Sequence, residues 1–498
     1  MLFYRGKINK INSQKLAYYP YLYKTLMRIR LLFFFILNSF LFKGQTNPCY
    51  FLTDTGTVDT ETSQSLVELS DGSVYVTGIQ SHGSSQIEDA ALLKFDKCGN
   101  VLWIKYFTDS LSIQGLYINK THDEKLILTG VVGNSSNNND IFFYKLDTSG
   151  NILLQKRYNN SANQSAKYIE QTSDKGFIFC GYVNDNYGNN DSYVVKTDSL
   201  GVVQWTQEIG SNGDEYANAV HETTDGNFIM VGDATSYGFG GTDVEVVKFH
   251  KNGNIIWDHT YGDNLNNGSQ GIIELSNGKY LTFGETEIAH FSPFDFFIDM
   301  IDTNGTDLGR HKFGGIATDA LFSLVETPGM QFICTGYSRS YNGLQAYDIV
   351  LFKVDTTGNI KWLKNFYSPG IDVGYEILPS LFGGYLITGL FANNNTDYVL
   401  IKSDTLGNVV LGINNAFKIN NETTVYPNPS TSTILIRSDI SFIERILIFD
   451  LLGRKVLEVN PTTTSNLLTI DVSSLTTGQY LAQITTSEGV LNKKINKN

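Results

Sequence analysis

Short apolar runs alternate with polar turns along most of the chain, and they recur in a fixed order. Residues 225–257 show the unit most clearly, with two strand-like runs, a polar loop, a third run, a tight turn and the start of a fourth. Runs of this length, bounded by Gly, Asn and Asp, are typical of β-strands. The middle runs 228–231 and 349–352 are apolar on both faces, so we expect both of their faces to be covered.

Two kinds of residue mark this unit seven times. A glycine ends each second strand, at Gly78, Gly130, Gly181, Gly232, Gly284, Gly336 and Gly389. An aspartate opens each third strand, at Asp89, Asp140, Asp191, Asp243, Asp295, Asp348 and Asp397, with a period of 49 to 53 residues. A period near 50 with four strands per unit is typical of a β-propeller, with an open solenoid as the alternative. Because ring closure removes exposed edge strands, we predict an all-β chain with a seven-bladed β-propeller over residues 45–411.

Small residues precede the second strand of nearly every unit. They lie fifteen residues before the strand-ending glycine, at Ser63, Gly115, Ala166, Ala217, Ser269 and Gly374, with Leu321 in the sixth unit. The first strand of a propeller blade lies nearest the axis, where the chains crowd together. We therefore expect these positions to lie close to the axis.

The N-terminal end of the repeat region contains an extra strand. Phe51 lies 20 residues before Asp71, so residues 50–54 resemble the outer strand of a blade that lacks its first three strands. Residues 408–411 are an alternative source of that strand, although we favour a contribution from the N-terminal one. Cys49 and Cys98 approach each other under only one closure scheme, and we expect no bond between them. Cys180 and Cys334 are expected in the core.

The N-terminus carries an export signal. Two arginines precede the apolar run 31–42, which is shorter than a typical transmembrane helix. We predict a signal peptide over residues 27–44, cleaved between Gly44 and Gln45, and a mature protein without a transmembrane segment. An uncleaved anchor is the alternative. Because Met27 directly precedes Arg28, residues 1–26 are interpreted as an upstream extension that is not translated in the cell.

Charge and motifs exclude several function classes. The net charge of −13 argues against nucleic acid as a partner. The seven histidines are scattered, and the chain contains no HExxH, GxSxG or P-loop motif. Lysines and aspartates two residues apart on the third strands recur in most units, so we interpret them as structural ion pairs or turn caps. We therefore predict no catalytic residue, no metal site and no cofactor.

The asymmetry between units lies in the loops that join the second and third strands. In a propeller these loops cluster on one face of the ring, where function usually resides. They are rich in Asn, Ser and Gly and carry aromatic residues, which suit contact with a glycan or a protein. The candidate binding rim consists of Tyr187, Tyr237, Phe239, Phe291 and Tyr341.

A different pattern begins after a polar linker at residues 412–423. Several short strand-like runs over residues 424–498 predict a small Ig-like β-sandwich. This module opens with Tyr426, Pro427, Asn428 and Pro429, and resembles the type A sorting domain of type IX secretion. The resemblance continues through Asp450 and Gly453 in a central hairpin, Gly478 and Tyr480 in a late G-x-Y element, and Lys493 and Lys494 near the end. The repeats before it resemble uncharacterised propeller repeats of secreted proteins from Bacteroidetes-type bacteria.

The resemblance implies export by the type IX secretion machinery, and removal of the domain by a sortase-like peptidase. The protein is then secreted or attached to the outer membrane at the cell surface. Our first hypothesis is a non-catalytic binding or adhesion module that uses the face with the variable loops. The alternatives are a glycan- or peptide-active hydrolase or lyase with its site at the propeller mouth, and a structural surface-layer component. A carboxylate cluster at the mouth would favour the enzyme, and an aromatic, uncharged rim would favour the binding module.

Overall fold

The computed structural model describes residues 49–498 apart from the segments 57–59, 83–86, 110, 134–138, 160–161, 185–187, 291, 342–345, 394, 410–422, 439–442, 451–453, 462–466 and 487–488. All regular elements in this part of the chain are β-strands, which confirms the predicted all-β class. The signal peptide, residues 1–26 and most of the predicted linker lie outside the described residues.

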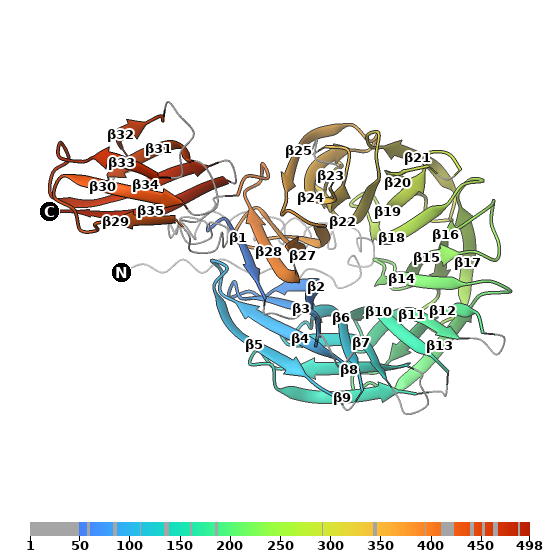
Figure 1. Ribbon diagram of the computed structural model, residues 1–498. Coiled ribbons are helices and arrows are strands. Elements are labelled where there is room, and N and C mark those ends of the chain that lie inside the picture. Colours follow the sequence, from blue (N-terminus) through green and yellow to red (C-terminus); the bar gives the residue numbers. More distant parts are fainter. Residues whose placement is uncertain are drawn as a thin grey trace, which may run out of the picture. The chain divides into compact units, whose positions relative to one another are not determined.

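The repeats form seven four-stranded antiparallel sheets, which we call blades (Figure 1). In blades 1 to 6 the strands pair in chain order. Blade 1 contains β2(Thr60–Glu68), β3(Val74–Ser81), β4(Glu88–Phe95) and β5(Val101–Phe107), and blade 2 contains β6(Ile113–Lys120), β7(Leu126–Gly133), β8(Asn139–Leu146) and β9(Ile152–Tyr158). Blade 3 contains β10(Gln164–Gln171), β11(Phe177–Asn184), β12(Asn190–Thr197) and β13(Val203–Ile209). Blade 4 contains β14(Glu215–Glu222), β15(Phe228–Ala234), β16(Asp243–Phe249) and β17(Ile255–Tyr261).

Blade 5 contains β18(Asn267–Glu274), β19(Tyr280–Glu287), β20(Phe294–Ile301) and β21(Asp307–Phe313), and blade 6 contains β22(Asp319–Thr327), β23(Gln331–Ser338), β24(Asp348–Asp355) and β25(Ile360–Phe366). Blade 7 combines β26(Val373–Pro379), β27(Tyr385–Asn393) and β28(Asn395–Ser403) with the N-terminal strand β1(Phe51–Thr55). The prediction that the N-terminal strand contributes to closure is therefore confirmed. It pairs with β28 from Phe51, opposite Lys402, to Thr55, opposite Tyr398.

The blades follow one another around a closed path, because the first strand of each blade contacts the first strand of the next, and β26 contacts β2. Figure 1 shows these first strands nearest the middle of the ring. The middle strands are buried on both faces, as expected, and β16 is buried along its whole length. The outer strands β5 and β17 consist almost entirely of exposed and partly buried positions. The hydrophobic core therefore consists of layers between neighbouring blades.

The expectation for the cysteines was wrong in one respect. Cys49, just before β1, forms a disulfide with Cys98 in the turn between β4 and β5. Once β1 joins blade 7, its start lies beside the outer turn of blade 1, which brings the two thiols together. Thr53 also donates a hydrogen bond to the carbonyl of Gly99 in the same turn, at 3.1 Å. Cys180 and Cys334 are buried, as predicted.

The C-terminal module contains two antiparallel sheets. One contains β29(Thr423–Tyr426), β30(Thr433–Ser438) and β33(Leu467–Asp471). The other contains β31(Ile443–Asp450), β32(Lys455–Val459), β34(Gly478–Thr486) and β35(Gly489–Lys497). Apolar residues from both sheets, including Ile436, Ile448 and Ile484, share one buried cluster.

Candidate functional site

A β-bulge interrupts the first strand of every described blade at the same position. The register between first and second strands shifts directly after the small residue predicted to lie near the axis. A bulge leaves one residue without a partner in the ladder and redirects its side chain. We call these seven residues the bulge ring: Gln64, Leu116, Lys167, Asn218, Gln270, Phe322 and Tyr375.

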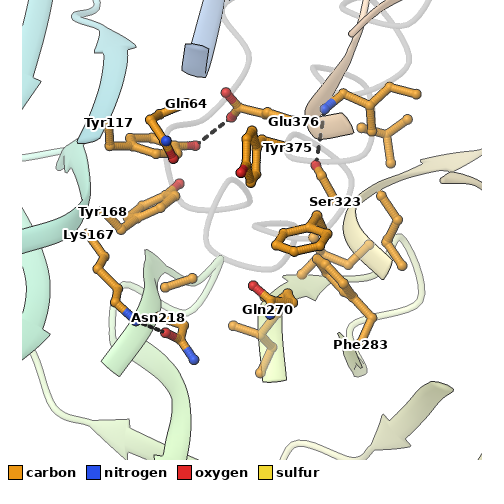
Figure 2. Close-up of a pocket in the computed structure, with 18 of the residues that line it drawn as sticks. Gln64, Tyr117, Lys167, Tyr168, Asn218, Gln270, Phe283, Ser323, Tyr375 and Glu376 are labelled. Atoms are coloured by element: carbon orange, nitrogen blue, oxygen red, sulfur yellow. Dashed lines mark hydrogen bonds between the residues drawn. The ribbon is translucent and has the colours of Figure 1, made fainter. Parts of the chain in front are cut away.

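The whole bulge ring lines a single cavity of about 500 Å³ (Figure 2). Its members differ in chemistry, with three amides, one ammonium group, two aromatic rings and one aliphatic side chain. The bulge position recurs in every blade, but its residue type changes from blade to blade. It is therefore free of the packing constraint that keeps the preceding position small in most blades. The cavity therefore has the asymmetry that a binding site requires.

One wall of the cavity is a polar network. The Tyr117 hydroxyl donates to Glu376 Oε1 at 2.8 Å, and the Leu66 amide donates to Oε2 at 2.6 Å. The rings of Tyr117 and Tyr168 lie 4.4 Å apart, and the Tyr168 hydroxyl lies 3.1 Å from Nδ1 of His221. Burial raises the pKa of Glu376 to about 7, so this carboxyl group changes its charge near neutral pH.

A second row of polar groups crosses from blade 3 to blade 5. Lys167 Nζ donates to Asn218 Oδ1 at 2.9 Å, and Asn218 Nδ2 donates to Asp233 Oδ2 at 3.0 Å. The Gln270 amide donates to both carboxyl oxygens of Glu285 at 3.3 Å. Burial lowers the pKa of Lys167 and raises that of Asp233. Burial and the nearby negative charge of Asp233 raise the pKa of Glu285 to about 8.

The remaining wall is apolar. Phe322 packs perpendicular to Tyr375 with ring centroids 5.4 Å apart, and Phe283 lies in the same wall (Figure 2). At the position after the bulge, blades 4 to 6 carry small residues, Ala219, Gly271 and Ser323, whereas blades 2, 3 and 7 carry Tyr117, Tyr168 and Glu376. A Cβ on Gly271 would lie only 2.4 Å from the Phe283 ring, so this glycine makes room for Phe283.

The bulge ring was not among the residues predicted from the sequence. Its signal is nevertheless present, because each member directly follows the position that marks the first strand, which is small in every unit except the sixth, where it is Leu321. A bulge depends on a register shift between two strands, and that shift leaves no mark in the alternation of a single strand. Comparing residue types at that position from unit to unit would have identified the ring as a candidate.

The predicted binding rim is only partly described. Phe239 is 62% exposed and Tyr341 is 36% exposed, so both are accessible. The Tyr237 hydroxyl instead donates to the buried Glu245, which ties that side chain to blade 4. Tyr187 and Phe291 lie outside the described residues, as do Gly44 and Gln45. The binding role of the rim stays a prediction.

The described residues contain no group of three or more His, Cys, Asp or Glu side chains arranged to hold a metal ion. In the same residues, no helix has the length and apolar character needed to cross a membrane.

In the C-terminal module, the Tyr426–Pro429 segment is fastened to the last strand. Asn428 donates to the carbonyl of Lys494 at 2.7 Å and accepts from the amide of Asn496 at 2.8 Å. The motif at its N-terminus and the basic residues at its C-terminus therefore lie side by side. Residues 424–498 match the family model described as the secretion system C-terminal sorting domain. The C-terminal module is a type IX secretion sorting domain.

Other predicted residues of the sorting domain maintain its turns. Asp450 accepts hydrogen bonds from the Arg454 amide and guanidinium, and the Tyr480 hydroxyl donates to the Thr476 carbonyl at 2.7 Å. Lys494 is exposed and Lys493 is partly buried, whereas Gly453 lies outside the described residues. A sorting domain indicates export to the cell surface or the medium.

Comparison with curated proteins finds no match. Among solved structures, the chain is similar to PorZ, a surface component of the type IX secretion system of Porphyromonas gingivalis, at 11% identity over 86% of this chain and 68% of PorZ, with a TM-score of 0.36. It is similar to the Pan2 WD40 domain of Neurospora crassa at 10% identity over 70% of this chain and 91% of that domain, with a TM-score of 0.45. A third similar structure is the α-L-arabinofuranosidase Arb93A of Fusarium graminearum, at 9% identity over 71% of this chain and 97% of the enzyme, with a TM-score of 0.40. At these scores the similarities carry no inference about ligand or reaction.

Proposed function

We propose that the protein is an exported seven-bladed β-propeller that acts as a non-catalytic binding module. The observation that carries this proposal is the central cavity, in which one structural position per blade presents amide, ammonium, aromatic and aliphatic side chains to a ligand. Exposed aromatic residues on the variable loops, Phe239 and Tyr341, add a second contact surface.

The mature protein begins after Gly44, and the C-terminal module is an Ig-like sandwich.

The sorting domain supplies the partner for export. It delivers the propeller to the type IX secretion machinery of a Bacteroidetes-type bacterium, where a sortase-like peptidase removes it. The test is deletion of residues 424–498, with a same-length variant carrying Asn428→Ala as a milder perturbation. We expect the truncated protein to accumulate in the periplasm, as measured by cell fractionation. Surface display of the truncated protein at the wild-type level would contradict the proposal.

Binding is tested with the mature protein on arrays of glycans and surface proteins. We expect saturable binding by the wild type. Lys167→Met changes the cavity, and Phe239→Ala changes the rim, so the two variants separate the two surfaces. Loss of binding in either variant supports the proposed binding function and shows whether the ligand binds in the cavity or at the rim. A wild-type protein that binds no glycan or protein on the arrays would argue for the structural surface-layer role.

The hydrolase alternative has one observation in its favour. Asp233 and Glu285 on adjacent blades are two carboxyl groups with raised pKa values, and paired carboxyl groups of unequal pKa serve general acid–base hydrolysis. Against it, each of these groups is engaged by an amide of the bulge ring. If the protein cleaves glycans or peptides, Asp233→Asn and Glu285→Gln should abolish turnover while ligand binding persists. Without turnover by the wild type, the binding module stands.

A further inference from the structure

We propose that the central cavity binds an uncharged pyranose sugar, either free or as the end of a glycan chain. This inference rests on the proposed binding function and names its ligand class. A pyranose ring has a flat apolar C–H face and an edge of hydroxyl groups that both donate and accept hydrogen bonds. The cavity contains a matching apolar wall and polar wall.

The apolar wall supplies aromatic surfaces. Phe322 and Tyr375 stand at 90° to each other, so they form a corner in which a flat ring lies against one face and is confined by the other. Phe283 extends the same wall (Figure 2). Exposing aromatic faces inside a cavity is costly unless an apolar surface covers them. The C–H face of a sugar would cover this corner and leave its hydroxyl edge directed at the opposite wall.

The polar wall offers groups with unused hydrogen-bonding capacity. Lys167 lines the cavity and has three N–H donors, and its hydrogen bond to Asn218 uses one of them. The Gln64 amide makes only a long 3.4 Å contact with Thr62. Within the described residues, the Tyr375 hydroxyl has no hydrogen-bond partner, although it lines the cavity. All three residues line the cavity, and Figure 2 shows the Lys167 ammonium group directed toward Asn218.

The balance of charge explains why the ligand is uncharged. An anionic ligand that approached Lys167 would also meet Glu376 in the same cavity, with Asp233 beyond Asn218. A cationic ligand that approached Glu376 would meet the ammonium group of Lys167 in the same cavity. Hydroxyl groups suit both signs, because they accept from an ammonium group and donate to a carboxyl group. The mixed polar wall therefore discriminates against ligands of either charge.

The size of the cavity sets an upper limit on the ligand. A volume of about 500 Å³ lies in the range of sites that enclose one small molecule, about 300–1,000 Å³. The cavity therefore accommodates one or two sugar units and not a long chain. A longer glycan would enter by its end.

The experiment measures binding of methyl pyranosides to the mature protein by calorimetry. Methyl glucoside, galactoside and mannoside are compared with glucuronate and glucosamine, the charged counterparts of the first. We expect at least one uncharged pyranoside to bind about tenfold or more tightly than either charged sugar. Lys167→Met should weaken that binding about tenfold or more, because it removes charged hydrogen bonds but keeps the length of the side chain. Tyr375→Phe should weaken it by a smaller factor, and Leu200→Ser in the exposed turn between β12 and β13 should not change it.

The results separate this inference from the proposed function. Equal or tighter binding of a charged sugar overturns the inference, as does sugar binding that is lost in Phe239→Ala and kept in Lys167→Met. If no sugar binds but the protein binds a surface protein, the inference fails and the binding module stands. If neither binds, both fail. If glycans bind only through their non-reducing end and the free pyranoside competes with them, the natural ligand is the end of a glycan chain.

Discussion

At the scale of the residue, the strand-ending glycines are required by the bulge opposite them. Gly232 pairs with Ala217, directly before the bulged Asn218, and a Cβ on Gly232 would lie 2.4 Å from the carbonyl oxygen of Tyr216. The same contact is 1.9–2.0 Å at the other six glycines of this set. Gly226 differs, because it has a positive φ of 77° in a turn and nothing within 4 Å of an added Cβ. The two glycines are therefore needed for different physical reasons.

These two glycines give a matched pair of substitutions. We expect Gly226→Ala to lower the free energy of unfolding by about 1 kcal/mol, the strain of a left-handed alanine. Gly232→Ala should cost about 3 kcal/mol, because the methyl group collides with backbone that cannot move without shifting the bulge. Urea unfolding followed by tryptophan fluorescence measures both. Equal costs for the two variants would refute the role assigned to the bulge.

Residue chemistry also corrects one detail of the repeated Lys–Asp pattern. The third-strand lysine does not pair with the aspartate two positions later. Lys196 instead binds Asp174 at the opening turn, at 2.8 Å, whereas Asp198 accepts two backbone amides of the turn that follows. Both groups maintain the blade, as the structural interpretation predicted. The pattern recurs because every blade needs the same turn.

At the scale of the element, β1 has a larger effect than its five residues suggest. It completes blade 7, buries Phe51 and Leu52, and carries the disulfide to blade 1. The blade 1–blade 7 junction is also fastened by Glu68, which accepts from the Leu381 amide at 2.6 Å. Equivalent contacts recur at other junctions, for example from the Thr224 amide to Glu274 at 2.7 Å. The disulfide is the feature that the other described junctions lack.

Removing the disulfide should therefore weaken ring closure. The bond closes a separation of 49 residues, for which chain entropy predicts a stabilisation of about 4 kcal/mol. We expect Cys98→Ser to lower the thermal midpoint in oxidising buffer, and a reductant to lower the wild type to the same value. The reductant should not change Cys98→Ser. A wild-type midpoint that is insensitive to reductant would show that β1 is held by its strand pairing alone.

At the scale of the whole molecule, several carboxyl groups of the ring are wholly or partly buried. Burial, with the charge of Asp319, raises the pKa of Asp295 to about 6, and burial raises that of Asp372 to about 6. Burial raises the pKa of Glu376, which lines the cavity, to about 7 and that of Glu285, behind Gln270, to about 8. All four lie above the ordinary carboxyl range near 4. Between about pH 4 and pH 8, these four carboxyl groups therefore bind more protons in the folded protein than in the unfolded chain.

This excess of protons determines how stability depends on pH. Because the folded state binds more protons, the contribution of these groups is greatest near pH 4 and is lost as pH rises through 6 to 8. We expect the free energy of unfolding to fall between pH 5 and pH 8, and Glu285→Gln to flatten that slope. The control is Glu458→Gln, since hydrogen bonds from Lys455 and Arg445 lower the pKa of Glu458 to about 2. A slope in the wild type that Glu285→Gln leaves unchanged would contradict this assignment.

The amino-acid sequence by itself determined the repeat, the strand order within blades 1 to 6 and the sorting domain. These depend on local spacing, because turn glycines, aspartates and alternating apolar residues act over a few positions. The tertiary structure alone decided which residues meet across the ring. Tyr117 and Glu376 are 259 positions apart, and they form a hydrogen bond only because the first strands converge on one axis. The bulge ring, the cavity and the Cys49–Cys98 bond depend on that convergence, and the spacing along the chain does not show which side chains meet there.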